Sequence, residues 1–221
     1  MNSKTKKIVG IGLFTAIVLV LQFLGGGIKF GMFSISLVLL PIVVGAAVYG
    51  WQAGAWLGFV FGVAVMLSGD AAAFMVVDPI GTVLTVLVKG TVAGLCSGLA
   101  YRFVLRLLDK YAQNRMPFIM RHYNIGTCCE EGMYKYISRN NRYFAVLVAA
   151  VVCPVINTGI FLLGCQLFFL ETVAGWGAAL GFENAASYMF LGLAGTNFLI
   201  ELGTNLLLSP VIVRIISYTK K

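Results

Sequence analysis

Two charged residues, Lys89 and Glu201, lie inside long apolar runs of the sequence. A charged side chain near the centre of a bilayer costs at least about 2.5 kcal/mol, so one that remains there usually faces a cavity or a partner. If the two runs are helices that begin at the outer surface, the rise of 1.5 Å per residue puts Lys89 about 15 Å and Glu201 about 20 Å below that surface. Both charges are therefore expected near the middle of the membrane.

Amide and hydroxyl side chains are expected at the same depth as these charges. Asn197 and Asn205 flank Glu201 at four-residue spacing, which places all three on one face of a helix. Asn157-Thr158 lies at a comparable depth in the preceding apolar run. We expect Lys89 to meet an anionic or carbonyl group of a ligand, and the other side chains to bond hydroxyls or amides. The predicted substrate-binding residues are Lys89, Asn157, Thr158, Asn197 and Glu201.

A structural role is the alternative for the same residues. Lys89 and Glu201 would then form a buried ion pair that holds helices together, and the asparagines would bond between helices. A buried ion pair is weak evidence for stability alone, which favours the cavity. The two hypotheses are compatible, because a resting pair can open to receive a ligand.

The composition indicates that a bilayer is the main solvent of this chain. Hydrophobic residues make up 60% of the sequence and charged residues 11%, and the mean hydropathy is +0.93, whereas soluble domains contain about 25% charged residues. The apolar runs far exceed the roughly 10-residue alternating strands of a membrane barrel, so helices must satisfy the backbone. At about 20 residues per span, 221 residues hold about six spans. We predict one all-α membrane domain over residues 1–221.

Six membrane helices are predicted, at about residues 8–24, 33–49, 51–67, 79–105, 143–170 and 188–217. The first run could instead be a signal peptide, but no A-x-A-like cleavage site follows it, which favours a retained helix. Residues 106–142 form the long polar segment and are predicted to be a cytoplasmic loop. With both termini in the cytoplasm (N-in/C-in), fourteen of the sixteen Lys and Arg residues fall on the inner side, as the positive-inside rule requires.

Several other functions are disfavoured by the sequence. The net charge of +8 is explained by membrane topology, so nucleic acid is not an expected partner. His122, Cys128 and Cys129, with the two glutamates that follow, match none of the usual tetrahedral spacings, so no metal site is predicted. Lys89-Gly90-Thr91 lacks the glycines and the order of a Walker A motif, so we expect no nucleotide hydrolysis by this chain and no cofactor.

The order of several short motifs resembles the substrate-binding S components of energy-coupling factor (ECF) transporters, the vitamin importers of bacteria and archaea. The resemblance covers nearly the whole chain apart from about residues 107–141. In chain order the motifs are Lys4-Thr5-Lys6-Lys7 leading to Gly12-x-x-x-Ala16, Phe33-Ser34-Ile35-Ser36-Leu37 through Pro41 to Gly45-Ala46, Gly54-Ala55 to Gly58-Phe59 with Ser68-Gly69-Asp70, Lys89-Gly90 with Ala93-Gly94, Pro154-x-x-Asn157-Thr158, and Asn197 to Glu201 with Pro210.

This resemblance implies a compact six-helix subunit, not an enzyme, in the cell membrane of a prokaryote. Such a subunit binds a vitamin from the outside among helices four to six, and depends on a membrane T component and two cytoplasmic ATPases. It implies that Gly12 and Ala16 form the surface for the T component, whereas internal packing is the alternative role for these small residues. The sequence looks most similar to the pantothenate and riboflavin carriers, and Lys89 would suit the carboxylate of pantothenate. The long segment 106–142 departs from the family, which usually has a short connection there.

Two other classes of function are open at this point. An autonomous secondary transporter or channel would use Lys89 and Glu201 for ion coupling. An assembly factor would use the same polar residues to join helices and would bind no ligand. Association with ATPase and T-component partners would favour the importer.

Overall fold

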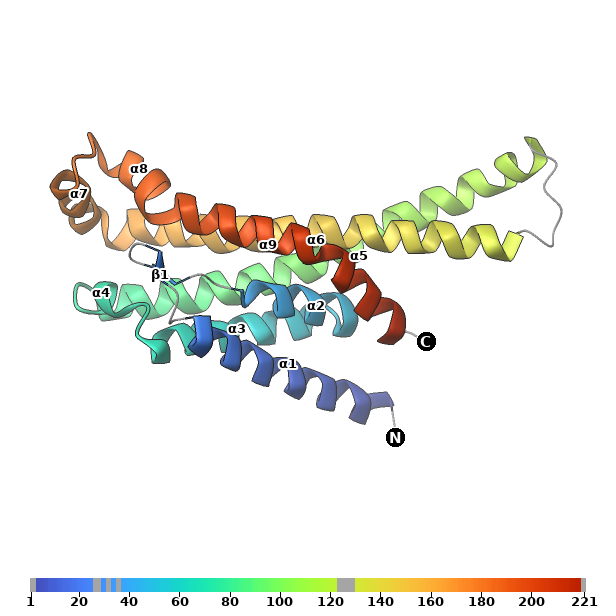
Figure 1. Cartoon of the computed structure of the whole chain (residues 1–221), viewed down its shortest axis with the longest axis horizontal. Helices are drawn as coiled ribbons and strands as arrows, with labels where there is room; N and C mark the ends of the chain where they lie inside the picture. Colours follow the sequence, from blue (N-terminus) through green and yellow to red (C-terminus); the bar gives the residue numbers. More distant parts are fainter. Residues whose placement is uncertain (1–2, 26–28, 31–32, 35–36, 123–129, 220–221) are drawn as a thin grey trace.

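The chain forms an elongated bundle of long helices (Figure 1). The structure, a computed structural model, describes residues 3–25, 29–30, 33–34, 37–122 and 130–219. Two-residue strands β1 (Lys29–Phe30) and β2 (Phe33–Ser34) pair antiparallel after the first helix. The helical elements are α1 (Ser3–Gly25), α2 (Leu39–Tyr49), α3 (Trp51–Ser68), α4 (Ala72–Met75), α5 (Pro79–His122), α6 (Glu130–Phe168), α7 (Leu170–Ala179), α8 (Ala185–Ser187), the π-helical η2 (Tyr188–Gly195) and α9 (Thr196–Thr219).

Most of these helices suit a membrane. Within the described residues, five helical stretches are long and apolar enough to cross one: Lys4–Gly25, Trp51–Ser68, Pro79–Arg115, Tyr136–Phe168 and Ala185–Arg214. The all-α membrane class predicted from composition is thereby confirmed. The remaining predicted span, the second in chain order (33–49), corresponds to α2, which has 11 residues and is about 16 Å long at 1.5 Å per residue. The two termini lie at one end of the bundle, and α4, α7 and α8 lie at the other (Figure 1).

Two predicted boundaries are wrong. The second helix was expected from residue 33 but begins at Leu39, and Phe33–Ser34 belongs to β2. The predicted loop 106–142 is largely helical, because α5 continues to His122 and α6 begins at Glu130. Its polarity marks where the helices leave the apolar layer. Its five Arg and three Met residues, with two Leu and two Lys, favour helix in water as well.

The extended parts of α5 and α6 form a pair that projects beyond the other helices (Figure 1). Asn141 Nδ2 of α6 donates to Asp109 Oδ1 of α5 at 2.9 Å, which joins the two helices. Cys128 and Cys129 lie outside the described residues. No group of three or more metal-ligating side chains occurs in the part of the chain that the structure describes.

Helices α3 and α5 pack with their backbones in contact. A Cβ atom added to Gly58 of α3 would meet the carbonyl oxygen of Gly90 of α5, and one added to Gly90 would meet that of Gly58. Gly54 and Gly94 face each other in the same way one turn away. Such small-residue contacts let membrane helices approach closely. With Gly90 held against α3, the α5 face that includes Lys89 turns toward the interior.

A hydrogen bond joins α9 to α6 at a backbone carbonyl that Pro154 leaves without a donor. Pro154 has no backbone N–H, so the carbonyl of Ala150 lacks its usual helical donor. Asn205 Nδ2 of α9 takes that place and donates to the Ala150 oxygen at 3.4 Å. Ser97 of α5 donates to the neighbouring Ala149 oxygen at 3.2 Å. These two bonds join α6 to α5 and to α9.

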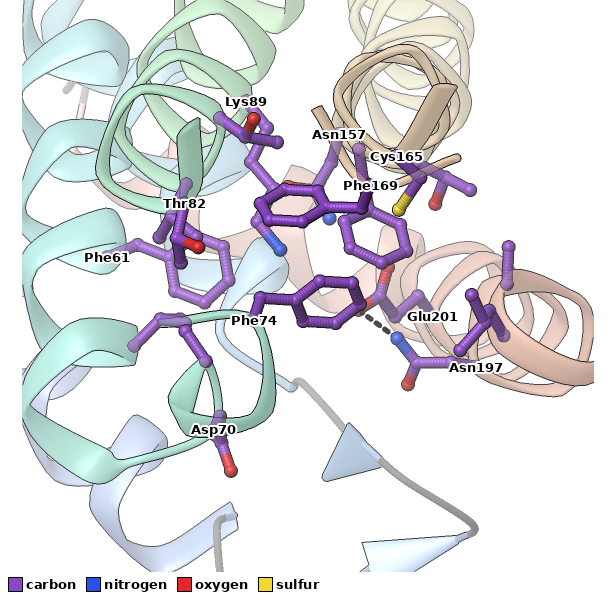
Figure 2. A pocket seen from close by; sticks show the side chains of 18 of the residues that line it. Phe61, Asp70, Phe74, Thr82, Lys89, Asn157, Cys165, Phe169, Asn197 and Glu201 are labelled. Atoms are coloured by element: carbon purple, nitrogen blue, oxygen red, sulfur yellow. Dashed lines mark hydrogen bonds between the residues drawn. The ribbon is translucent and has the colours of Figure 1, made fainter. Parts of the chain in front are cut away.

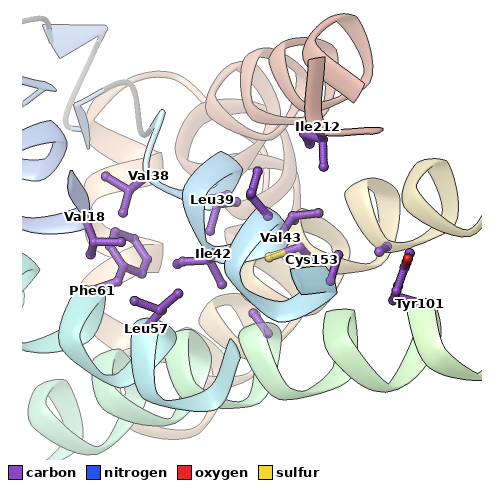
Figure 3. Packing of buried hydrophobic residues seen from close by; sticks show 14 of the residues in the cluster. Val18, Val38, Leu39, Ile42, Val43, Leu57, Phe61, Tyr101, Cys153 and Ile212 are labelled. Atoms are coloured by element: carbon purple, nitrogen blue, oxygen red, sulfur yellow. The ribbon is translucent and has the colours of Figure 1, made fainter. Parts of the chain in front are cut away.

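The apolar core is built around α2, in which every residue from 41 to 47 is buried. Figure 3 shows Ile42 and Val43 of α2 among side chains of α1, α3, α6 and α9. A second apolar cluster, which includes Phe74, Phe169 and Tyr188, packs at the end that contains α4 and α7. Residues of both clusters line the cavity between them.

Candidate functional site

A cavity lies among α3, α5, α6 and α9 and is closed on one side by α4 (Figure 2). It offers about 70 Å³ to the centres of water-sized spheres, and one water needs about 10–15 Å³ of such space. The structure brings all five predicted substrate-binding residues to this one cavity. They are Lys89 of α5, Asn157 and Thr158 of α6, and Asn197 and Glu201 of α9.

Lys89 extends into the cavity from α5 (Figure 2). Its Nζ atom lies 5.1 Å from the centre of the Phe161 ring, which is a cation–π contact. No hydrogen bond joins Lys89 to Glu201 among the described side chains, although their opposite charges attract each other across the cavity. The ammonium therefore keeps its capacity to donate to another group.

Glu201 and Asn197 share one face of α9, as their spacing predicted. Asn197 Nδ2 donates to Glu201 Oε1 at 3.1 Å, and both side chains point into the cavity (Figure 2). The second carboxylate oxygen of Glu201, Oε2, is buried and has no hydrogen-bond partner within the described residues. Asn205, one turn further, binds the α6 backbone instead, so its role is structural.

The segment before α9 is π-helical, which the expected regular helix over 188–217 did not include. The buried residues of η2 recur at five-residue spacing, as Tyr188 and Leu193 and as Met189 and Ala194. The wider π turn, with its i→i+5 bonds, sets this spacing, and π segments often occur at functional sites. It brings Leu193 and Ala194 to the cavity wall directly before Asn197.

A second polar group at the cavity was not predicted as a site. Gln22 of α1 is buried, and its Nε2 donates to Asp70 Oδ2 at 2.6 Å and to Ser68 Oγ at 3.2 Å. Gln22 and Asp70 both line the cavity. A glutamine inside the first apolar run was the sequence feature that could have indicated this group. With Asp70 and Glu201, the cavity holds two carboxylates beside one ammonium.

Aromatic rings form much of the remaining wall. Phe74 of α4 packs edge-to-face on Phe161, Phe169 and Trp176, with ring centres 5.9, 5.0 and 5.4 Å apart. Figure 2 shows the Phe74 ring pointing across the cavity toward Glu201 and Asn197. The sequence did not predict this wall, because Phe74 lies in the connection between two membrane helices.

Long apolar helices that surround a cavity with polar side chains are typical of membrane proteins that bind a small molecule. The chain belongs to the substrate-specific components of ECF transporters, because the sequence model of this family matches residues 6–213. No curated protein sequence matches the chain. The fold is similar to that of ThiT from Listeria monocytogenes, with a TM-score of 0.62 and 20% identity over 98% of this chain and 96% of that one.

Family membership confirms the resemblance noted in the sequence. The chain is a substrate-binding membrane subunit of an ECF importer of vitamins, and such subunits are transport proteins, not enzymes. The family implies association with a T component and ATPases. The pantothenate and riboflavin subgroup stays a prediction.

Proposed function

We propose that this subunit captures a vitamin-like micronutrient in the cavity between Lys89 and Glu201 and passes it to the importer in a prokaryotic cell membrane. The observation that supports this proposal is the convergence of polar side chains from α5, α6 and α9 on one cavity. A polar side chain in a membrane interior costs free energy, so one that remains there usually contacts a ligand, a transport pathway or a partner. In the proposal, Lys89 donates to an anionic or carbonyl group, and Asn157, Thr158 and Asn197 bond the rest of the ligand.

The proposed partners are a membrane T component, which docks on α1, and two cytoplasmic ATPases, which hydrolyse ATP. Gly12 and Ala16 are exposed on α1, and no described atom lies within 4 Å of a Cβ added to Gly12. Gly10, by contrast, packs against Tyr49 of α2. The chain itself does not cover the Gly12 face, which supports docking over internal packing.

The proposed topology is six spans with both termini in the cytoplasm, α2 serving as a short second span. The location of both termini at one end of the bundle supports an even number of passes (Figure 1). A cysteine introduced at Ser3, in a chain without its native cysteines, should resist membrane-impermeant labelling of intact cells. Labelling from outside would rule out this topology.

The substrate prediction of pantothenate depended on the charge of Lys89. The cavity is also lined by Asp70 and Glu201. A ligand with a single anionic group would explain Lys89 but not these two carboxylates. Pantothenate stays a prediction, to be compared with other vitamins in direct binding assays.

Co-purification tests the proposed function against an autonomous secondary transporter. A tagged chain from its native membrane should retain a T component and two ATPases, and vitamin uptake into vesicles should require all of them and ATP. Uptake by the chain alone, driven by an ion gradient, would instead support the secondary transporter that couples ions through Lys89 and Glu201.

Ala16→Trp should separate docking from binding. A bulky side chain on the exposed face of α1 should abolish partner-dependent uptake and leave ligand binding to the isolated subunit unchanged. Leu13→Trp, on an equally open part of α1, is the comparison that maps how far the docking surface extends. A parallel loss of binding and uptake in Ala16→Trp would mean that α1 serves internal packing.

A further inference from the structure

We propose that the ligand is a planar heteroaromatic compound with N–H donors on one edge and an acceptor on another. The donors would bond Glu201, Asn157 and Thr85, and Lys89 would donate to the acceptor. This inference rests on the proposed function and specifies the substrate class of the same cavity.

Three buried oxygens at the cavity have no partner in the described part of the chain. They are Glu201 Oε2, Asn157 Oδ1 and Thr85 Oγ1, on residues that are 2%, 5% and 6% exposed. All three residues line the cavity. A buried polar atom left without a hydrogen bond destabilises a protein, so a set of them at one cavity indicates groups reserved for a ligand.

The chemistry of these oxygens specifies what the ligand must supply. A carboxylate oxygen and an amide oxygen can only accept hydrogen bonds, and a hydroxyl can accept as well as donate. The ligand must therefore bring donors to Glu201 and Asn157. Lys89 has only donors and lies one helical turn after Thr85 on α5, so the opposite requirement, an acceptor, applies at its ammonium.

The walls indicate that the group bearing these donors is flat. The rings of Phe61, Phe74, Phe161 and Phe169 all line the cavity, and Phe74 already makes edge-to-face contacts with two of them. A planar ring can pack on such walls by offset stacking or edge-to-face contact. A heterocycle combines that face with N–H groups and acceptors around its rim. An aliphatic acid without hydroxyl or amide groups would satisfy Lys89 and leave Glu201 Oε2 without a donor. Pantothenate has such donors, but it has no ring to pack on the aromatic walls.

The test uses the full chain in lipid nanodiscs and measures equilibrium binding of named probes. The heteroaromatic probes are pterin, riboflavin and 4-amino-5-hydroxymethyl-2-methylpyrimidine, each compared with an N-methylated form that lacks a donor, and pantothenate is the aliphatic probe. We expect at least one heteroaromatic probe to bind more tightly than pantothenate and to lose affinity on N-methylation. Binding of pantothenate alone, or of no probe, would overturn the inference.

Two substitutions locate the contacts. Glu201→Gln keeps an oxygen for Asn197 but removes the charged acceptor, and it should weaken binding of the best heteroaromatic probe about 10- to 100-fold. Thr85→Val keeps the side-chain shape and should weaken it roughly three- to tenfold. Thr91→Val, on the same helix with its hydroxyl bonded to the Leu87 carbonyl, and Glu171→Gln, on the exposed surface of α7, are the matched controls.

Thermal unfolding of each ligand-free variant shows whether it is folded. Glu201→Gln should unfold no earlier than the native chain, because it removes a buried charge without a full set of partners. Unchanged probe affinity in a folded Glu201→Gln protein would overturn the inference. Co-purification with the T component and ATPases is scored separately, so the substrate class can fail while the importer function stands.

Discussion

Replacing Lys89 by Met gives the sharpest test of the cavity. Met preserves most of the length of the side chain and removes its charge. A charge-assisted hydrogen bond from Lys89 to the ligand contributes about 1.5–3 kcal/mol, so its loss should weaken binding roughly 10- to 100-fold. Lys110→Met, at an exposed position further along α5, is the matched control and should bind normally.

The effect of Lys89→Met on folding should be small. Lys89 forms a cation–π contact with Phe161 at 5.1 Å and no hydrogen bond with Glu201 among the described residues. Losing the cation–π contact costs about 0.5–2 kcal/mol, and relief of a desolvated charge offsets part of that cost. We expect a net loss of about 1 kcal/mol or less, which corresponds to roughly 2–4 °C in Tm for a chain of this size.

A structural ion pair would behave differently. Lys89→Met would then leave Glu201 alone in a low-dielectric site and cost about 3–5 kcal/mol of stability, and the added change Glu201→Gln would largely restore it. Equilibrium binding and thermal unfolding of both single mutants and the double mutant distinguish the two cases. Normal ligand affinity in folded Lys89→Met protein would refute the assignment of Lys89 to the site.

Two further substitutions test the packing that positions the cavity. Gly58→Ala places a methyl group against the α5 backbone and should cost about 1–3 kcal/mol in thermal unfolding, whereas Gly12→Ala, with open space around it, should be neutral. Asn205→Leu leaves the Ala150 carbonyl without its donor and should cost about 1–3 kcal/mol. That cost should shrink when Pro154→Ala restores a backbone N–H; an equal cost in both backgrounds would contradict the proline explanation.

The membrane class and the site candidates followed from the sequence because lipid imposes simple rules. Long apolar runs must be helices, and a charge within them is too costly to be accidental. Lys89 and Glu201 were identified by this argument alone. The four-residue spacing of Asn197 and Glu201 also placed both on one face, which their hydrogen bond confirms.

Other features required the three-dimensional structure. The long polar segment was mistaken for a loop, because polarity reports where a helix meets water and not where the helix ends. The helix α4 and its ring Phe74 reach the cavity through a connection whose path depends on packing. Gln22 and Asp70 lie 48 residues apart in the chain and meet only when α1 packs beside the end of α3.

The sequence by itself determined that the chain is embedded in a bilayer. Composition and the length of the apolar runs show whether lipid or water surrounds a chain, and neither depends on any tertiary contact. The sequence also determined which side chains are too polar to face lipid. The tertiary structure alone decided how those side chains are combined, since the rotation of each helix is set by its neighbours. The contact between Gly58 and Gly90 sets the rotation of α5, and the hydrogen bond from Asn205 to Ala150 sets the rotation of α9. Lys89 and Glu201 therefore face one cavity without forming a hydrogen bond to each other.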